Sequence, residues 1–110
     1  MDFNEYQRMT RLTDSSRHST EPAYVYYVLG LCGEAGEVAE KIKKLLRDNN
    51  GVVTDEFKKL LTKELGDVMW YNARLADLFG IEFDDVGVTN IEKLLDRQER
   101  NLIHGEGDER

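Results

Sequence analysis

Four acidic residues occur in the sequence as two pairs with the same spacing, Glu34 with Glu37 and Glu64 with Asp67. Residues three apart are neighbours on the surface of a helix, so each pair places two carboxylates together. Clustered carboxylates raise one another's pKa, and a hard divalent cation such as Mg²⁺, which prefers oxygen ligands, removes that repulsion. Either pair alone would be read as an ordinary solvated acidic face. Two matched pairs predict a magnesium site.

Two long predicted helices must position these acids. A turn-forming run at 48–51 separates them, and Thr54 after it is a good N-cap for the second. We predict four helices in all, near residues 3–13, 22–47, 54–79 and 84–100, followed by a loop at 105–108. The expected fold class is all-α, a helical bundle of about four helices with a long antiparallel hairpin at its core. A chain of 110 residues forms one domain, 1–110.

Helical geometry predicts that both acid pairs lie on one flank of that hairpin. Measured from the centre of the apolar stripe of each long helix, the first acid of a pair lies about 60° and the second about 120° to the same side. Antiparallel neighbours are related by a two-fold axis, so equal offsets land on the same side. A hairpin folded about residues 50 and 51 also brings Glu34 level with Asp67, and Glu37 level with Glu64.

Other metal ions fit this pattern less well. Zinc prefers Cys and His ligands, and a di-iron bundle uses Glu-x-x-His motifs. His18 and His104 both lie in predicted loops away from the acid pairs. No 12-residue stretch has the oxygen ligands of a calcium-binding EF-hand.

Several residues off the main apolar stripe indicate self-association. Tyr26, Leu29 and Cys32 give the first half of the second long helix more than one apolar side, as at a subunit contact. Cys32 is expected to be a small buried residue and no catalytic thiol. The aromatic residues Trp70 and Tyr71 could stack on a nucleotide base, although packing in a core or interface is the commoner use.

The composition limits the class of partner. The formal net charge is −7, so a nucleic-acid polymer is a poor partner, whereas one phosphorylated small molecule can be held through metal ions. The single cysteine suits a reducing compartment. Neither a leader peptide nor an apolar run long enough for a bilayer is apparent, so we expect a cytoplasmic protein and no membrane partner.

The motifs that carry these acids resemble a known family. Residues 33–40 read GEAGEVAE and residues 63–71 read KELGDVMWY. The pattern E-x-x-E, a spacer and E-x-x-D resembles the all-α nucleoside-triphosphate pyrophosphohydrolase superfamily, in particular its MazG-like branch, over about 24–97. The opening residues 3–7 resemble the first helix of small members, and residues 103–110 resemble the tail of compact, phage-type members.

The resemblance implies an activity. Such proteins hydrolyse ribo- or deoxynucleoside triphosphates to the monophosphate and pyrophosphate with Mg²⁺, and Mn²⁺ could replace it. They form homodimers or homotetramers whose sites lie at subunit contacts. The four acids would then be metal ligands, with Glu37 also expected to orient the attacking water.

The resemblance also extends to a downstream N-x-x-K-x-x-x-R pattern for the phosphates, met here by Asn90, Lys93 and Arg97. These three share one helix face, which could equally be solvated. Lys41, Lys44 and Lys59 are expected to face solvent. The tail 105–110 either closes over the bound nucleotide or frays.

Two alternatives stay open. Relatives specific for dUTP, dCTP or phosphoribosyl-ATP carry similar acids. A non-catalytic helical dimer that binds a nucleotide or a metal and regulates a partner would need no matched set of four acids.

Overall fold

The computed structural model describes residues 1–15 and 22–110 of the chain. They form four helices, with no strand in these two ranges: α1 (Phe3–Thr13), α2 (Ala23–Asn49), α3 (Asp55–Leu78) and α4 (Phe83–Glu99). The expectation of an all-helical chain is confirmed, and each end lies within two residues of its predicted place. The predicted loop position of His18 lies outside the described residues.

Local signals explain where the helices begin and end. Asp2 caps α1 by accepting a hydrogen bond from the backbone N–H of Glu5 at 2.7 Å, and Thr54 caps α3 by accepting one from Phe57 at 3.1 Å. At the end of α2, Asn50 and Gly51 have positive φ values of 51° and 73°. The N–H of Gly51 then bonds the carbonyl of Leu45 at 3.0 Å, which closes the helix with a left-handed turn.

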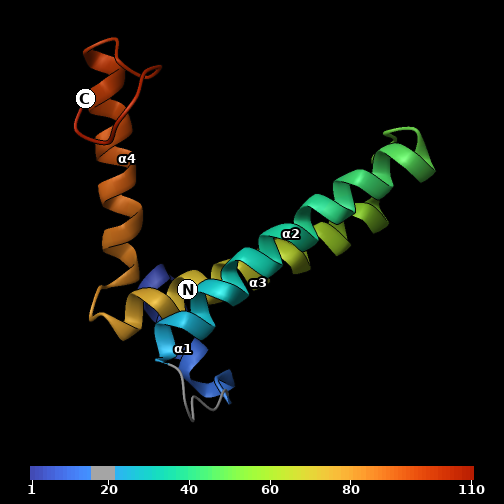
Figure 1. Cartoon of the computed structure of the whole chain (residues 1–110), viewed down its shortest axis with the longest axis horizontal. Coiled ribbons are helices and arrows are strands. Elements are labelled where there is room, and N and C mark those ends of the chain that lie inside the picture. Colours follow the sequence, from blue (N-terminus) through green and yellow to red (C-terminus); the bar gives the residue numbers. More distant parts are fainter. Residues whose placement is uncertain (16–21) are drawn as a thin grey trace.

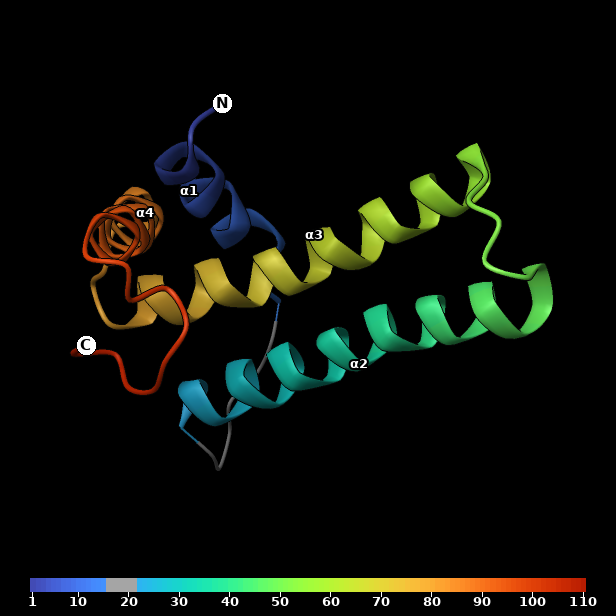
Figure 2. The same ribbon diagram turned by 90° about the horizontal axis from the view of Figure 1, so that it is seen from above.

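The helices form two arms that meet at one end (Figure 1). α2 and α3 lie side by side and run in opposite directions, and α1 lies on the other side of α3 in the second view (Figure 2). α4 leaves the end of α3 after a short turn and points away from the paired helices. The long helices therefore form one arm and α4 forms the other.

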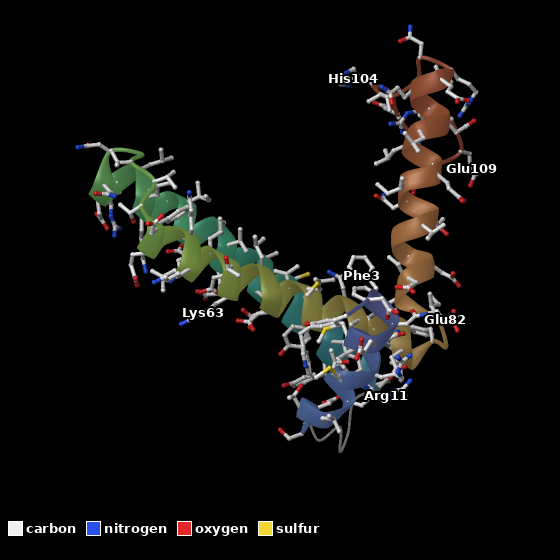
Figure 3. The ribbon with its side chains drawn as sticks, turned by 180° about the vertical axis from the view of Figure 1, so that it is seen from behind. Phe3, Arg11, Lys63, Glu82, His104 and Glu109 are labelled. Atoms are coloured by element: carbon white, nitrogen blue, oxygen red, sulfur yellow. The ribbon has the colours of Figure 1, made fainter. Side chains whose placement is uncertain are left out.

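The small core lies where α1, α3 and α4 meet. Ala73, Ala76 and Phe83 are buried there, with Tyr6 and Met69 packed against them. Phe3 adds its ring at 5.2 Å from that of Phe83 and lies in the angle between the two arms (Figure 3). This junction fixes the direction in which α4 leaves the paired helices.

Several large apolar residues of the long helices are exposed in the part of the chain that the structure describes. Tyr27 is the buried apolar residue of α2 within the described ranges, whereas Leu29 and Leu65 are 68% and 52% exposed. The prediction that Cys32 is buried is wrong for the single chain, where the residue is exposed. Within the described ranges no helix is both long and apolar enough to cross a bilayer.

Candidate functional site

Three of the four predicted acids meet in the structure. Glu34 of α2 and Glu64 and Asp67 of α3 each offer a carboxylate oxygen, and these oxygens all lie within 4.8 Å of one another. Glu34 and Glu64 are half-buried, and Asp67 is exposed. Burial, and then the charges of Asp67 and Glu64, raise the pKa of Glu34 above its usual value. The cluster therefore carries an electrostatic strain that a cation would relieve.

Glu37 stands outside this group of three. It lies one turn further along α2 than Glu34, and its side chain is exposed. Its negative charge still contributes to the raised pKa of Glu34. It is thus close enough to act on the cluster without being part of its closest contacts.

One lysine faces the cluster against expectation. Lys41, expected to point into solvent, lies with its ammonium nitrogen 3.6 Å from a carboxylate oxygen of Glu64, and its side chain is 26% exposed. Among residues 1–15 and 22–110, this is the ion pair that the three acids form, so the described part of the site is negative. The donor set consists of carboxylate oxygens, which suits Mg²⁺ and does not suit zinc. His104 lies at the far end of the other arm (Figure 3).

A cavity of about 450 Å³ opens beside two of these acids. Its lining combines acids, aromatic rings and small polar side chains from three segments: Thr13, Asp14, Ser15, Tyr26, Glu34, Asp67, Trp70 and Tyr71. The indole N–H of Trp70 donates to the hydroxyl of Thr13 at 2.8 Å, which ties α3 to the end of α1. The cavity is large enough for a nucleotide-sized ligand.

The aromatic residues of this cavity pack against one another. The ring of Tyr71 packs against two other rings, that of Trp70 at 5.0 Å and that of Tyr26 at 6.2 Å between centroids. Burial, followed by a hydrogen bond with Tyr26 and by the charges of Glu34 and Asp67, raises the pKa of Tyr71 to about 12. Tyr71 is therefore a neutral phenol at any physiological pH. Sequence reasoning did not single out Thr13, Asp14 or Ser15 for this site, because only the packing of α1 brings them to α3.

The basic residues of α4 lie elsewhere in the single chain. Asn90 and Lys93 line a second cavity of about 390 Å³ that shares no residue with the first. Arg97 is 3% exposed, and both Lys93 and Arg97 form ion pairs with Asp108 of the tail, at 3.2 and 3.4 Å. The structure therefore groups Lys93 and Arg97 with the tail, and the cavity lined by Asn90 and Lys93 is separate from the one beside the acidic cluster.

Comparison with known proteins shows the family of this chain. The family model of the MazG nucleotide pyrophosphohydrolase domain matches residues 24–101, which include all four acids and the three residues of α4. The chain belongs to the MazG family. It is also 49% identical over 85 residues to the Gene 37 protein of Mycobacterium phage L5, an alignment that covers 77% of this chain and 75% of that protein. No solved structure matches.

The MazG match shows which part of the chain corresponds to the family domain. It begins in α2 and ends just after α4, so the two acid pairs and the N-x-x-K-x-x-x-R residues fall inside it. α1 and most of the tail fall outside it. The family suggests a nucleotide pyrophosphohydrolase, and the residues outside the match are where this chain can differ from other members.

Proposed function

We propose that this chain hydrolyses nucleoside triphosphates to the nucleoside monophosphate and pyrophosphate with Mg²⁺ held by Glu34, Glu37, Glu64 and Asp67. The observation that carries the proposal is the meeting of three of these carboxylates within 4.8 Å beside a nucleotide-sized cavity. When bound, the metal would neutralise charge on the phosphates. Mn²⁺, with the same preference for carboxylate oxygens, is expected to substitute.

The chain's own residues supply the remaining chemistry. Glu37 is exposed beside the cluster and takes a proton from the attacking water. The water oxygen forms a bond to the α-phosphorus while the bond from that phosphorus to the α–β bridging oxygen breaks. The bridging oxygen keeps the electron pair and leaves as part of pyrophosphate, and the nucleoside monophosphate remains. No side-chain nucleophile is required, which agrees with the absence of Cys32 from the lining of the cavity.

The nucleoside is proposed to enter the aromatic cavity. Tyr26, Trp70 and Tyr71 offer ring faces and edges for a base. Glu34 and Asp67 belong to the same lining, so a base held there keeps its phosphates near the acids. The sugar and base preference depends on the polar groups of residues 13–15, which form the third side.

The active form is proposed to be a homodimer or homotetramer. Leu29 is 68% exposed and Tyr26 is 44% exposed, although the Tyr26 ring packs on one side against Tyr71 of α3. Cys32, on the same half of α2, is exposed as well. A single chain that leaves this much apolar surface exposed gains stability by burying it against a second copy. Asn90, Lys93 and Arg97 are proposed to hold substrate phosphates in that assembly, where α4 of one chain can approach the acids of another.

Light scattering tests the assembly. We expect more than one chain per particle at micromolar concentration, and Leu29→Glu should shift the protein towards monomer because it places a charge in the contact. Leu12→Glu, at an exposed leucine of α1, is the matched control. A wild-type protein that stays monomeric would contradict the proposal.

Product analysis tests the activity. The protein is incubated with Mg²⁺ and a panel of ribo- and deoxynucleoside triphosphates, including dUTP and dCTP, and with phosphoribosyl-ATP. Monophosphate and pyrophosphate as products support the proposal, and a single accepted compound would identify one of the specialised relatives. Nucleotide binding without turnover at any metal concentration would favour the alternative, a non-catalytic regulatory dimer.

A further inference from the structure

The tail after α4 folds back along that helix. His104 lies beside the far end of α4, and Glu109 lies further back towards its start (Figure 3). The loop is held closed on itself by Arg110, whose guanidinium donates to the carbonyls of Ile103 at 2.8 Å and Leu102 at 3.1 Å. Gly107, with φ of 82°, provides a backbone turn that other residues rarely adopt. The tail therefore has a defined conformation on α4.

The carboxylate of Asp108 lies between two cations of α4. One of its oxygens is 3.2 Å from the ammonium of Lys93 and 3.4 Å from the guanidinium of Arg97. The hydrogen bond from Lys93 and its charge, and then the hydrogen bond and charge of Arg97, lower the pKa of Asp108. The two basic residues are four apart, one turn of the helix, so together they form a cradle for an oxyanion.

Arg97 is unusual among the charged residues of the described ranges. It is 3% exposed, and its Nη2 donates to the carbonyl of Asp108 at 2.7 Å. Its Nε is buried and has no hydrogen-bond partner among residues 1–15 and 22–110. A buried guanidinium N–H without a partner is costly, because an arginine can give up neither its charge nor its donors. The tail covers this cation without satisfying it.

The covering group is itself easy to displace. The side chain of Asp108 is 81% exposed, and that of Lys93 is 36% exposed. An exposed ion pair contributes little stability, so a ligand with more charge and more oxygen acceptors can replace it. A phosphate group has both, and it could also reach the unused donor of Arg97.

We propose that Asp108 is a built-in competitor, which occupies the site that Lys93 and Arg97 are proposed above to provide for the phosphates of the substrate or for pyrophosphate. The tail is then a strap that an incoming polyphosphate must lift. The inference rests on the proposed function for the identity of the ligand, whereas the site itself is a property of α4 and the tail. It reverses the expectation that the tail closes over a bound nucleotide.

Titration with inorganic pyrophosphate in the presence of a metal chelator tests the site without any need for activity. Asp108→Asn should bind pyrophosphate about two- to fivefold more tightly than the wild type, the range expected for the loss of a competing surface ion pair. Glu109→Gln removes the same charge from the next residue, for which the described residues provide no ion pair, and should bind as the wild type does. Lys93→Gln should weaken binding in both the wild-type and Asp108→Asn backgrounds.

Two results would overturn the strap. Equal affinities for Asp108→Asn and Glu109→Gln would mean that only net charge matters. Weaker binding by Asp108→Asn would mean that Asp108 orders the site and does not compete for it. Inorganic phosphate and a nucleoside triphosphate, titrated in the same way, distinguish a general phosphate site from one that needs a polyphosphate.

Steady-state kinetics separates this inference from the proposed function. If both are right, Asp108→Asn lowers KM for the nucleoside triphosphate and leaves kcat unchanged. A wild-type protein without hydrolytic activity would end the proposed function, while the pyrophosphate titration would still decide the strap. Tighter pyrophosphate binding with an unchanged KM would remove the site from the catalytic cycle, and with it the part of the inference that names the substrate.

Discussion

Gly30 of α2 lies directly beneath the ring of Tyr71 of α3. A Cβ atom built on Gly30 would stand 2.2 Å from Cε1 of Tyr71, far inside van der Waals contact. The absence of a side chain at position 30 therefore permits the phenol to lie against α2, where it lines the cavity beside Glu34 and Asp67. A glycine in the middle of a long helix, usually a weakness, here serves the shape of the site.

Gly30→Ala should displace Tyr71 and raise KM for the nucleotide. Alanine gains up to about 1 kcal/mol in helix propensity, but overpacking typically costs about 1–3 kcal/mol, so the melting temperature should not rise. Gly33→Ala is the matched control, because a Cβ there meets nothing within 4 Å. Thermal unfolding and KM, measured side by side, check both expectations. A variant more stable than the wild type with the same KM would show that Tyr71 moves without consequence.

Glu34→Gln should stabilise the metal-free protein and abolish turnover. The pKa of Glu34 is raised in the folded chain, so its charged form costs stability once the pH exceeds its usual value of 4.5. Removal of the charge relieves that cost at pH 7. Thermal unfolding in chelator and hydrolysis at saturating Mg²⁺ form the paired measurement. Glu40→Gln, at an exposed acid of α2 paired with Lys43, should leave turnover unchanged.

Asp77→Asn should lower the free energy of unfolding by about 1–2 kcal/mol at pH 7, as for a hydrogen bond between charged groups. Hydrogen bonds from Arg11, and then from Arg74, lower the pKa of Asp77 to about 2 from its usual value of 3.8. A folded-state pKa below the unfolded one stabilises the fold fully above about pH 4. That contribution is lost as the pH falls through 2.

Urea unfolding of Asp77→Asn and the wild type between pH 7 and pH 2 measures this difference, which should shrink over the last two pH units. Asp48→Asn provides the comparison, because its partner Arg47 is the next residue along the chain and both side chains are exposed. We expect Asp48→Asn to lower the free energy of unfolding only slightly, because an exposed ion pair contributes little stability. If the difference in free energy of unfolding between Asp77→Asn and the wild type stays constant down to pH 2, Asp77 stabilises the fold through packing alone.

Gln7→Ala should lower the free energy of unfolding by about 2–4 kcal/mol, since it leaves the backbone groups of residues 81 and 83 without their partner. The amide of Gln7 is 5% exposed; its Nε2 donates to the carbonyl of Ile81 at 2.8 Å, and its Oε1 accepts from the N–H of Phe83 at 3.1 Å. Gln7 thus links α1 by hydrogen bonds to the turn between α3 and α4, which sets the direction of α4. Gln98→Ala on the exposed surface of α4 should change the midpoint of urea unfolding by much less. If Gln7→Ala and Gln98→Ala lose similar amounts of stability, Gln7 does not hold α1 to the turn before α4.

The amino-acid sequence by itself determined the helices and the chemistry of the acids. Thr54 as N-cap and the turn at Asn50 and Gly51 depend on groups within a few residues, so local rules place the helix ends within two residues. The three-residue spacing of the acid pairs likewise follows from one helical turn. These features involve short-range geometry, which a sequence displays directly.

Tertiary structure decided which of these groups meet. The helical period gives the side of a helix that a residue occupies, but not the side-chain rotamers or the angle between elements. The helical period therefore did not predict that Glu37 lies outside the group formed by the other three acids. It also did not predict that Lys41 forms an ion pair with Glu64. The same limit applies to Arg97, whose burial depends on a tail that returns from ten residues away. Contacts between distant segments arise from packing, and packing is decided by the whole chain at once.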